Sequence, residues 1–526
     1  MRLIALGALL LCASYPPFRL PLLSFIAVAP AVVLVRQAAR DADPRGAFRW
    51  GWWYGVAANG VVLYWMIVAL WHFTPFSALG YLSTVAVLGL LTATMFWFVV
   101  RLRLVAPAVP LWVAFPVAWT ALEWLVGHLG DVRFPWLGLG TSLADAPVLV
   151  QWADLAGARG VTLWLAWVNV AIVEAWMTTG DGGRGTGLAI ARRLAPALAT
   201  IALALGYGVW REKTLPVREV GVIGLIQPNE GFREKWEPGR RDAVVAKLIT
   251  MSQQVMRLAR PQLVVWPEAA IPGYLFQHPQ WDEAISGLAQ ASHTPILAGG
   301  LYADPSAPPP IPYYNAAFLY DSTGDWHSHR VYGKHYLVPI VERVPFVPAR
   351  WMQGLPGLGN WAGGFDRGRE LPVYATALGR FGALICYESA FEDLPRRYRR
   401  AGADFLVNIT NDAWFGRTSA PRQHASHLVL RAIETRMGVA RAANSGISEF
   451  VDPLGRAYAA TELGRDTLVA DRLRTSDVTT LYVRWGDWVG TLCVLATLGL
   501  AAVLVVNRWQ SRPSHAPLTT HHAPPS

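Results

Sequence analysis

The sequence predicts a polytopic α-helical membrane protein that carries one α/β domain outside the membrane. The chain of 526 residues is 53% hydrophobic and only 16% charged, which is too apolar for an ordinary soluble enzyme. Long apolar runs occupy residues 1–211 and 485–507, whereas residues 213–480 have ordinary globular composition. Within that central segment, short apolar runs alternate with amphipathic stretches, as they do in layered α/β domains.

Eight apolar runs are candidates for membrane helices, which need about 20 residues each. An alternative interpretation of the first run is a cleaved signal peptide, but no small-residue cleavage site is evident and a second run follows after one short turn. We therefore expect eight spans, near residues 2–17, 20–36, 50–72, 79–101, 110–128, 158–178, 191–211 and 485–507.

Arginines in the short loops predict how these spans are oriented. Loops with several arginines alternate with loops that have few, and the positive-inside rule places the former in the cytoplasm. Both termini are then cytoplasmic, and the central segment lies on the opposite side, the periplasm of a Gram-negative cell. This topology and scattered surface arginine account for the net charge of +10, so the charge does not indicate nucleic acid binding. The arginines concerned are Arg36, Arg40, Arg45, Arg49, Arg101, Arg103, Arg184, Arg192, Arg193, Arg508 and Arg512.

These patterns divide the chain into four parts. We expect a seven-span membrane domain over residues 1–211, a periplasmic domain over 212–482 and a C-terminal transmembrane helix over 483–508. Residues 509–526, rich in Pro, His and Ser, are expected to form a disordered cytoplasmic tail.

The periplasmic domain is predicted to alternate strands and helices. Amphipathic spacing predicts helices over residues 240–259, 281–292 and 424–440. Two further runs, 439–443 and 448–451, followed by Asp452-Pro453-Leu454-Gly455, predict a hairpin. Strands are predicted over residues 220–226, 263–266, 295–299, 316–320, 383–386 and 405–409.

Three polar clusters at predicted strand ends indicate acyl-transfer chemistry. Cys386 is the only cysteine outside the apolar runs, Glu268 ends another strand, and Lys334 opens a third segment. A thiol with an ordinary pKa of about 8.5 is mostly protonated at neutral pH, so a nucleophilic cysteine needs a base or a positive neighbour. Glu268 can supply the base. Lys334 and the amide N–H of Tyr387 can stabilise an oxyanion.

Simpler interpretations of these residues remain open at this point. A lone cysteine at a strand end is most often a small buried hydrophobe, and Lys334 can be a surface charge. Glu342 and Glu388 are further carboxylates that can hold Lys334 charged and oriented. Two histidine pairs, His327 with His329 and His424 with His427, have spacings compatible with metal binding. A cysteine-thioester mechanism needs neither metal nor cofactor, and we expect none.

The clusters occur in motifs that resemble a known family. The central domain resembles the nitrilase (carbon–nitrogen hydrolase) superfamily, and almost the whole chain, about residues 10–505, is similar to the apolipoprotein N-acyltransferase family. One departure is Ile340-Val341-Glu342, where the family has Phe-Gly-Glu, so that the glutamate is kept without its glycine. The motifs include Gln227-Pro228-Asn229, Val265-Trp266-Pro267-Glu268, Tyr332-Gly333-Lys334-His335, Ile385-Cys386-Tyr387-Glu388 and Asn408-Ile409-Thr410-Asn411-Asp412-Ala413-Trp414-Phe415-Gly416.

The resemblance implies a fold, a reaction and a set of site residues. The fold is an α-β-β-α sandwich. Cys386 takes an acyl chain from the sn-1 position of a phospholipid, expected to be phosphatidylethanolamine, as a thioester. It then passes the chain to the N-terminal amine of a diacylglyceryl apolipoprotein. By the same resemblance Glu268 is the general base, Lys334 stabilises the oxyanion, Glu342 and Glu388 are supports, Trp236, Tyr387 and Trp414 line the substrate entrance, and the enzyme is a monomer of the bacterial inner membrane.

Two other functions are considered. A membrane-tethered amidase of the nitrilase type would use the same three residues, but eight spans exceed what anchoring needs. A polytopic transporter or scaffold with an inactive domain would not need all three residues, and its spans would be expected to show clustered charges or broken-helix pairs. Glu123 and Glu174 lie in predicted spans. An intramembrane carboxylate is a functional candidate, although an interhelical hydrogen bond is the simpler explanation.

Overall fold

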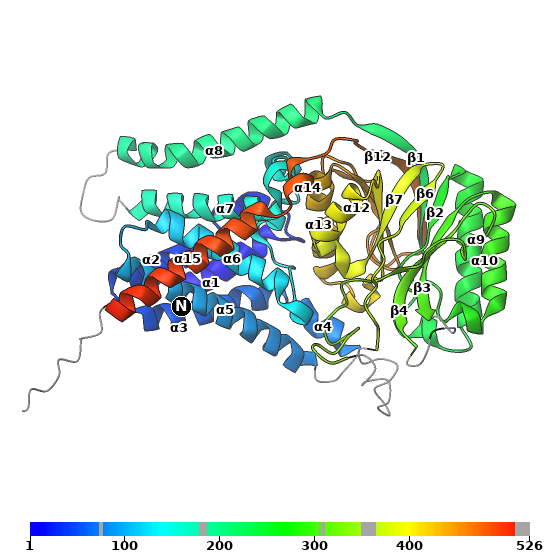
Figure 1. The fold of residues 1–526 in the computed structure, drawn as a ribbon, viewed down its shortest axis with the longest axis horizontal. Coiled ribbons are helices and arrows are strands. Elements are labelled where there is room, and N and C mark those ends of the chain that lie inside the picture. The colour runs from blue at the N-terminus through cyan, green and yellow to red at the C-terminus, as the bar shows by residue number, and fades with distance from the viewer. Residues whose placement is uncertain (73–76, 178–186, 304–306, 308–310, 349–363, 511–526) are drawn as a thin grey trace, which may run out of the picture.

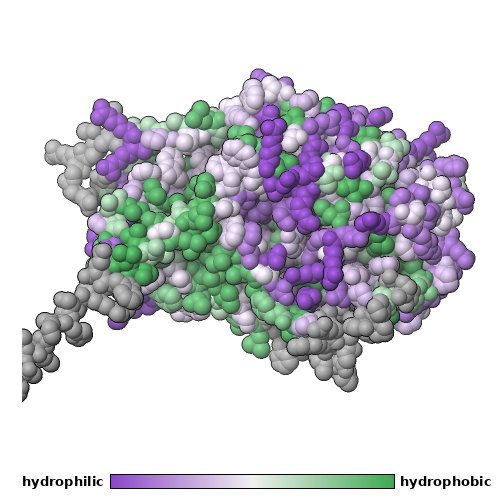
Figure 2. Space-filling view, in the orientation of Figure 1, coloured by the Kyte–Doolittle hydropathy of each residue, from purple (hydrophilic) through white to green (hydrophobic). Residues whose placement is uncertain are grey.

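The computed structural model describes residues 1–72, 77–177, 187–303, 307, 311–348 and 364–510. The chain forms two halves joined side by side, an elongated bundle of helices and an α/β half (Figure 1). Their surfaces differ as the composition predicts, because hydrophobic residues cover much of the helical half and hydrophilic residues gather over the α/β half (Figure 2). The predicted tail over residues 509–526 lies almost entirely outside the described residues.

The helical half contains every apolar run that the sequence indicates. An inserted 3-10 turn, η1 (Pro21–Phe25), precedes α2. The last helix of the chain, α15, returns to the bundle from the far end of the sequence and packs with α6 (Figure 1). The helices are α1 (Arg2–Ser14), α2 (Ala29–Arg40), α3 (Pro44–Val62), α4 (Trp65–Trp71), α5 (Ser77–Val105), α6 (Leu111–His128), α7 (Ala153–Met177), α8 (Gly187–Thr214) and α15 (Trp488–Gln510).

The structure does not confirm all eight predicted spans. Among the described residues, five helical segments are long and apolar enough to cross a membrane, or six if the pair α3 and α4, bent by 61°, counts as one. Helix α1 has only 13 residues, about 20 Å at 1.5 Å per residue, which is less than the roughly 30 Å of a hydrocarbon core. Helix α6 has 18 residues, contains Pro116 and Glu123, and is not among the five.

The α/β half is built on two six-stranded sheets. In each sheet the strands at the centre are parallel and the outer ones antiparallel. The first sheet has the order β12 (Thr467–Thr475), β1 (Arg218–Gln227), β2 (Leu263–Val265), β3 (Ile296–Ala303), β4 (Tyr313–Tyr320), β5 (Tyr332–Gly333). The second has the order β11 (Ala457–Tyr458), β10 (Glu449–Val451), β9 (Gly438–Ala443), β8 (Phe405–Thr410), β7 (Gly379–Ile385), β6 (Val373–Thr376).

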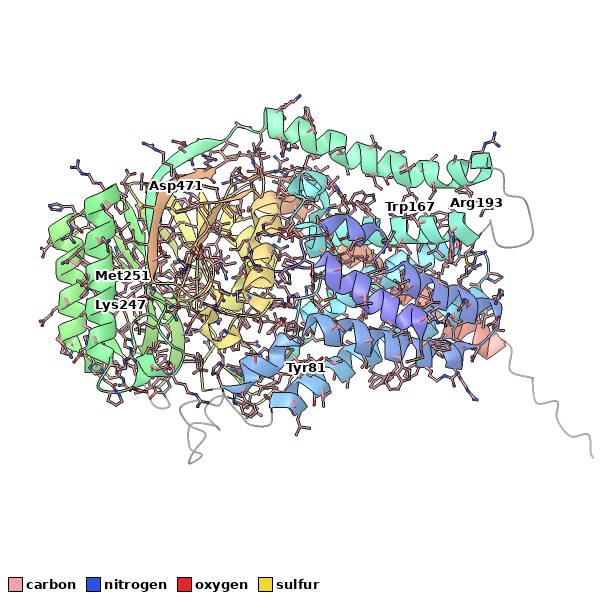
Figure 3. The ribbon with its side chains drawn as sticks, turned by 180° about the vertical axis from the view of Figure 1, so that it is seen from behind. Tyr81, Trp167, Arg193, Lys247, Met251 and Asp471 are labelled. Carbon is pink, nitrogen blue, oxygen red and sulfur yellow. The ribbon has the colours of Figure 1, made fainter. Side chains whose placement is uncertain are left out.

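Helices cover the outer faces of both sheets, which gives the expected α-β-β-α order of layers. Helices α9 (Arg241–Ala259) and α10 (Pro279–Ser292) pack on the first sheet at the end of the molecule remote from the bundle. Helices α12 (Asp393–Arg400) and α13 (Ala420–Thr435) pack on the second sheet. The apolar core between the sheets is formed by alternate residues of the central strands, such as Leu225, Val265 and Val407. Figure 3, seen from behind, shows Lys247 and Met251 on the outer helix layer and Arg193 at the opposite end of the molecule.

Most predicted elements of this half are confirmed to within a few residues. The helix predicted over 424–440 is wrong at both ends, because α13 begins at Ala420 and ends at Thr435. Arg436 then adopts a left-handed conformation with φ 55°, which ends the helix. Residues 438–443 form the buried strand β9, which continues the parallel sheet beside β8.

Helix α13 joins the two halves because both of its faces are buried. Leu428 and Ala432 belong to the core of the second sheet, whereas Val429, Leu430 and Ile433 belong to the core of the helical bundle. Each of the Val, Leu and Ile side chains among them stabilises its interface by roughly 1.5–3 kcal/mol when fully buried.

A buried chain of charges crosses the same junction. Arg159 of α7 lies 3.6 Å from both Glu123 of α6 and Glu392, which directly precedes α12. Arg431 of α13 lies 3.5 Å from Glu392 and 2.8 Å from Glu434. Removing one member leaves its partner buried and uncompensated, which typically costs 3–5 kcal/mol. The junction is therefore fixed by matched charges as well as by apolar packing, and Glu123 takes part in it as an interhelical contact.

Candidate functional site

Cys386 is presented at a sharp turn between a strand and a short helix. It follows β7 directly and begins the 3-10 helix η7 (Cys386–Ala390). Its φ is 52°, a left-handed conformation that costs a residue with a Cβ about 1–2 kcal/mol. Such strain persists only where the flanking structure fixes it, and it is concentrated at functional sites. The side chain is 3% exposed, so the thiol lies inside the α/β half.

Glu268 follows β2 and is held by donors from three different segments. Its Oε2 accepts a hydrogen bond from the Asn411 backbone N–H at 2.8 Å. Its Oε1 accepts from Asn315 Nδ2 at 2.7 Å and from Lys334 Nζ at 3.1 Å. The backbone here is pressed against β3, where a Cβ on Gly299 would stand 2.3 Å from the Pro267 carbonyl oxygen. Only glycine at position 299 permits this close approach.

Lys334 lies in the middle of the site with its charge fully buried. Its backbone N–H donates to the Asn315 carbonyl at 2.8 Å, which continues the β4–β5 pairing. Burial alone would lower its pKa, but the carboxylates of Glu268 and Glu342 outweigh burial and raise the pKa of Lys334 well above its usual value. The ammonium is therefore a permanent positive charge at neutral pH.

The thiol of Cys386 is within the electrostatic reach of both groups. Burial, followed by the Glu268 carboxylate, raises the pKa of the Cys386 thiol well above its usual value, while the Lys334 ammonium acts in the opposite direction. The resting thiol is consequently protonated. The Glu268 carboxylate can take the thiol proton, and the Lys334 ammonium can neutralise an anion that forms nearby.

Glu342 contacts the lysine directly, as the sequence leads one to expect of a supporting carboxylate. Its Oε1 accepts from Lys334 Nζ at 2.8 Å and from Asn315 Nδ2 at 2.9 Å. Its Oε2 accepts from the Val338 backbone N–H at 2.8 Å. Two carboxylates thus share one ammonium, with Asn315 bridging them.

Glu388 is placed differently, because it ties the cysteine turn to the lysine strand. Its Oε2 accepts from the Ile385 N–H and from the Tyr332 hydroxyl, each at 2.7 Å. Its Oε1 accepts from the backbone N–H groups of His335 at 2.6 Å and Tyr336 at 3.1 Å. Burial raises the pKa of Glu388 to about 7, against these hydrogen bonds, which lower it. Glu388 therefore acts on Lys334 through the backbone of the strand that carries it.

The three aromatic residues expected at the substrate entrance come from separate short helices. Tyr387 in η7 is buried, and its hydroxyl donates to the Arg133 carbonyl at 2.8 Å. Its ring stacks near Trp136, at 6.3 Å between centroids, so it packs against the loop between α6 and α7. Trp236, in η5 (Glu234–Trp236), and Trp414, in η8 (Asp412–Phe415), are half-buried.

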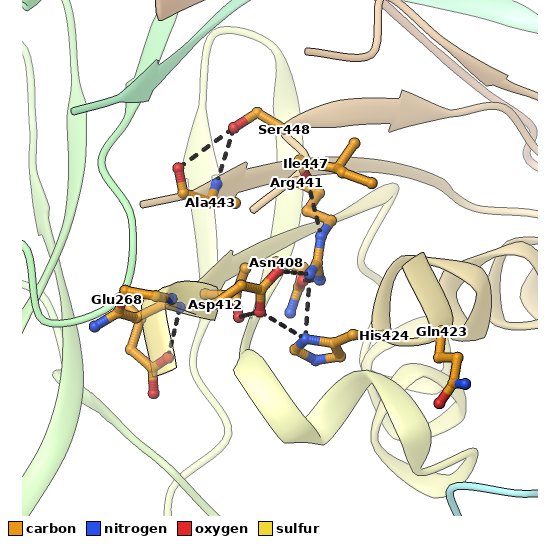
Figure 4. Close-up of polar contacts among 12 residues, drawn as sticks. Glu268, Asn408, Asp412, Gln423, His424, Arg441, Ala443, Ile447 and Ser448 are labelled. Atoms are coloured by element: carbon orange, nitrogen blue, oxygen red, sulfur yellow. Dashed lines mark hydrogen bonds and ion pairs between the residues drawn. The ribbon is translucent and has the colours of Figure 1, made fainter. Parts of the chain in front are cut away.

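Sequence reasoning did not single out several residues that form this site. Asn315, which bridges Glu268 and Glu342, lies in an ordinary strand sequence that gives no signal. Asn411 and Asp412 carried a signal, since they belong to the motif after β8. Figure 4 shows Arg441 held between Asn408, Asp412 and His424. Arg441 donates to Asn408 at 2.5 Å and to Asp412 at 2.9 Å, which supports the backbone that binds Glu268. His424 contacts Asp412 at 2.9 Å.

Comparisons with known proteins match both halves of the chain. Residues 222–481 match the carbon–nitrogen hydrolase family, and residues 7–171 match the apolipoprotein N-acyltransferase N-terminal domain. Full-length relatives named apolipoprotein N-acyltransferase include one from Geobacter metallireducens, which is 32% identical over 95% of this chain and 94% of its own. Another is from Chlorobaculum tepidum, 29% identical over 95% of each chain. A third is from Brucella melitensis, 32% identical over 93% of this chain and 92% of its own.

Proposed function

The chain belongs to the apolipoprotein N-acyltransferase family, and on this premise we propose that it moves an acyl chain from a phospholipid to the N-terminal amine of an apolipoprotein. The donor is the sn-1 ester of a phospholipid, with phosphatidylethanolamine the expected headgroup. The acceptor is the α-amino group of a diacylglyceryl-modified cysteine. The observation that carries the proposal is the buried set of thiol, ammonium and carboxylates in a half that is packed firmly against apolar helices.

The first half-reaction forms a thioester on Cys386. Glu268 takes the thiol proton while Sγ bonds to the ester carbonyl carbon, and the Lys334 ammonium neutralises the oxyanion. When this intermediate collapses, the carbon–oxygen bond breaks and Glu268 returns the proton to the leaving lysophospholipid hydroxyl.

The second half-reaction releases the acyl chain. The acceptor amine attacks the thioester carbonyl, an amide bond forms and the carbon–sulfur bond breaks. A proton lost by the amine passes through Glu268 to the Cys386 thiolate, which restores the resting thiol. Exclusion of water from the buried sulfur protects the thioester from hydrolysis between the two steps.

The membrane topology is part of the same proposal. In the proposed topology, eight spans leave both termini in the cytoplasm and the α/β half in the periplasm, over the outer leaflet of a bacterial inner membrane, with a monomer as the working unit. The position of Arg193 supports this orientation, because it lies at the end of the helical half remote from the α/β half (Figure 3). Trp210 and Trp485 are 50% and 65% exposed near the two ends of the α/β segment, where indole rings favour the membrane interface.

Mass spectrometry of the purified protein after incubation with phospholipid tests the proposal. The expected result is a mass increase of one acyl chain on Cys386, lost when a diacylglyceryl peptide with a free N-terminus is added. Cys386→Ser is the matched control and should show no thioester. An adduct that water releases faster than the peptide would favour an amidase or hydrolase. No adduct at all would favour a transporter or scaffold.

A further inference from the structure

A buried lysine outside the predicted site lies beside the chain segment that carries Glu268. Lys235 belongs to η5 and its side chain is only 2% exposed. Its Nζ donates a hydrogen bond to the Ala269 carbonyl at 2.9 Å, which places the ammonium beside the residue that follows Glu268. Its Nζ also lies 5.0 Å from the centre of the Trp236 ring, within the range of a cation–π contact.

Burial of the Lys235 ammonium is unfavourable for folding stability, so the presence of a lysine here indicates a functional role. Within the described part of the chain, no carboxylate lies within ion-pair distance of Lys235, although Glu268 and Glu230 act on it at longer range. Burial lowers the pKa of Lys235 to about 8, while these two carboxylates raise it. A buried ammonium with one hydrogen bond costs stability, and an apolar residue of similar size would avoid that cost.

The carbonyl that Lys235 holds belongs to a strained residue. Ala269 has φ 48°, a left-handed conformation that is unfavourable for alanine. This conformation turns the chain directly after Glu268, and the hydrogen bond from Lys235 holds it. The η5 region is itself fixed at both ends, since Arg241 donates to the Trp236 carbonyl at 3.0 Å and Arg233 donates to the His72 carbonyl, directly after α4, at 2.7 Å.

We infer that Lys235 is a positioning residue for the acyl-transfer reaction, which fixes the backbone at Glu268 and presents a positive charge to the carboxylate that takes the proton of Cys386. The inference rests on the proposed function. Lys235 touches no reacting atom, and its effect is exerted through Glu268. The groups that face Glu268 are Lys235, Lys334, Cys386 and Glu342, which shares the Lys334 ammonium and the Asn315 amide with it. Those that face Lys235 are Glu268 and Glu230, and Glu230 is itself paired with Lys247 of α9 at 2.8 Å.

The charge of Lys235 has a consequence for the dependence of the reaction on pH. A positive neighbour favours the ionised form of a carboxylate, so removal of Lys235 allows protons to compete for Glu268 at higher pH. In a plot of the rate of thioester formation against pH, the acidic limb is the range in which the rate falls as pH decreases. Without Lys235 this limb moves toward neutral pH. A purely structural lysine would lower the rate or the stability without moving that limb.

The test compares three substitutions in the full-length protein. Lys235→Met removes both charge and hydrogen bond, Lys235→Gln keeps a donor for the Ala269 carbonyl without the charge, and Lys235→Arg keeps the charge. The initial rate of acyl adduct formation on Cys386 is measured from pH 5 to pH 9. The Met and Gln variants should move the acidic limb upward by about one pH unit, the size typical of losing one opposite neighbour. The Arg variant should keep the limb of the wild type.

Arg330→Met is the matched control, because this arginine is 74% exposed and its pair with Glu370 involves neither Glu268 nor Glu230. It should leave the limb in place. If Lys235→Met fails to fold, Lys235→Gln decides. An unmoved acidic limb in a folded Gln variant overturns the inference.

A second readout separates this inference from the proposed function. The rate at which iodoacetamide alkylates Cys386 also depends on Glu268 as base and needs no lipid. If the wild type forms no acyl adduct, the proposed function fails, and the pH profile of alkylation still tests Lys235. The same upward shift in the Gln variant supports its role, and identical profiles refute it.

Discussion

Lys334 lies closer to Glu342, at 2.8 Å, than to Glu268, at 3.1 Å. The proposed base therefore does not neutralise the lysine alone. Glu342 takes the stronger contact with the ammonium, and Asn315 donates to both carboxylates. This division leaves Glu268 able to accept a proton while Lys334 stays charged.

Replacement of Glu342 by Gln should disturb this division. With one negative partner removed, the ammonium is drawn toward Glu268 and stabilises its ionised form, so Glu268 becomes a weaker base. We expect thioester formation to slow by about 10²-fold, the scale of a general-base contribution, with little change in the phospholipid concentration for half-maximal rate. Glu370→Gln, which removes an exposed partner of Arg330, is the control. A Glu342→Gln rate within twofold of wild type would show that Glu342 is only structural.

Glu388→Gln should loosen the turn that presents Cys386. Four donors converge on this carboxylate, and an amide offers them only one acceptor oxygen. Hydrogen bonds to a charged group are worth about 1.5–3 kcal/mol each, so we expect a loss of about 10²-fold in thioester formation and slower alkylation of Cys386. Glu283→Gln, on the exposed face of α10, is the control. Unchanged alkylation would contradict a positioning role.

His335 should make the protein sensitive to mild acid. Burial lowers the pKa of His335 to about 4, whereas the unfolded chain binds a proton near pH 6.5. Between these values the unfolded state holds more protons, so stability falls as pH decreases from about 6.5 to 4. For this partly buried ring we expect a loss of about 1–2 kcal/mol. Melting curves should show a weaker pH dependence for His335→Asn, and no such change for His327→Gln, whose ring is 71% exposed.

Arg431→Met should weaken the junction between the halves. It leaves Glu434 buried without its 2.8 Å partner, for an expected cost of about 3–5 kcal/mol. For a domain of this size the melting temperature should fall by roughly 6–20 °C. Arg330→Met removes a pair that is 74% and 56% exposed, which is worth at most about 1 kcal/mol. Equal shifts for the two variants would mean that the charge chain contributes no more than a surface pair.

The order of elements in the α/β half could be predicted from the sequence, and the fold brings the predicted residues Glu268, Lys334 and Cys386 within electrostatic reach of one another. Strands such as β1 and β8 are mostly apolar without strict alternation, which their burial in the parallel centre of a sheet explains. The predicted helix overlaps the start of β9 because Gly438–Ala443 is short and apolar except for Arg441, and period alone does not separate a buried strand from a buried helix. The end of α13 depends on the left-handed Arg436, a residue type that gives no terminating signal.

The number of membrane spans and the supporting residues were less predictable. Helices α3 and α4 read as one continuous apolar run, and the break near Leu63 and Tyr64 has no proline or glycine to mark it. Asn315 and Lys235 reach the site only through the pairing of β4 and the placement of η5. Their roles depend on which groups they meet in space, and no local pattern carries that information.

The double burial of α13 also bears on how this protein can be handled. An α/β half produced without the helical bundle would expose Val429, Leu430 and Ile433 to water as one hydrophobic stripe. The carboxylate of Glu434 would lie beside it without its partner from the bundle. Such a fragment is expected to aggregate or to bind detergent and chaperones. A fragment of the α/β half that is suitable for work in solution would need polar residues in place of that stripe.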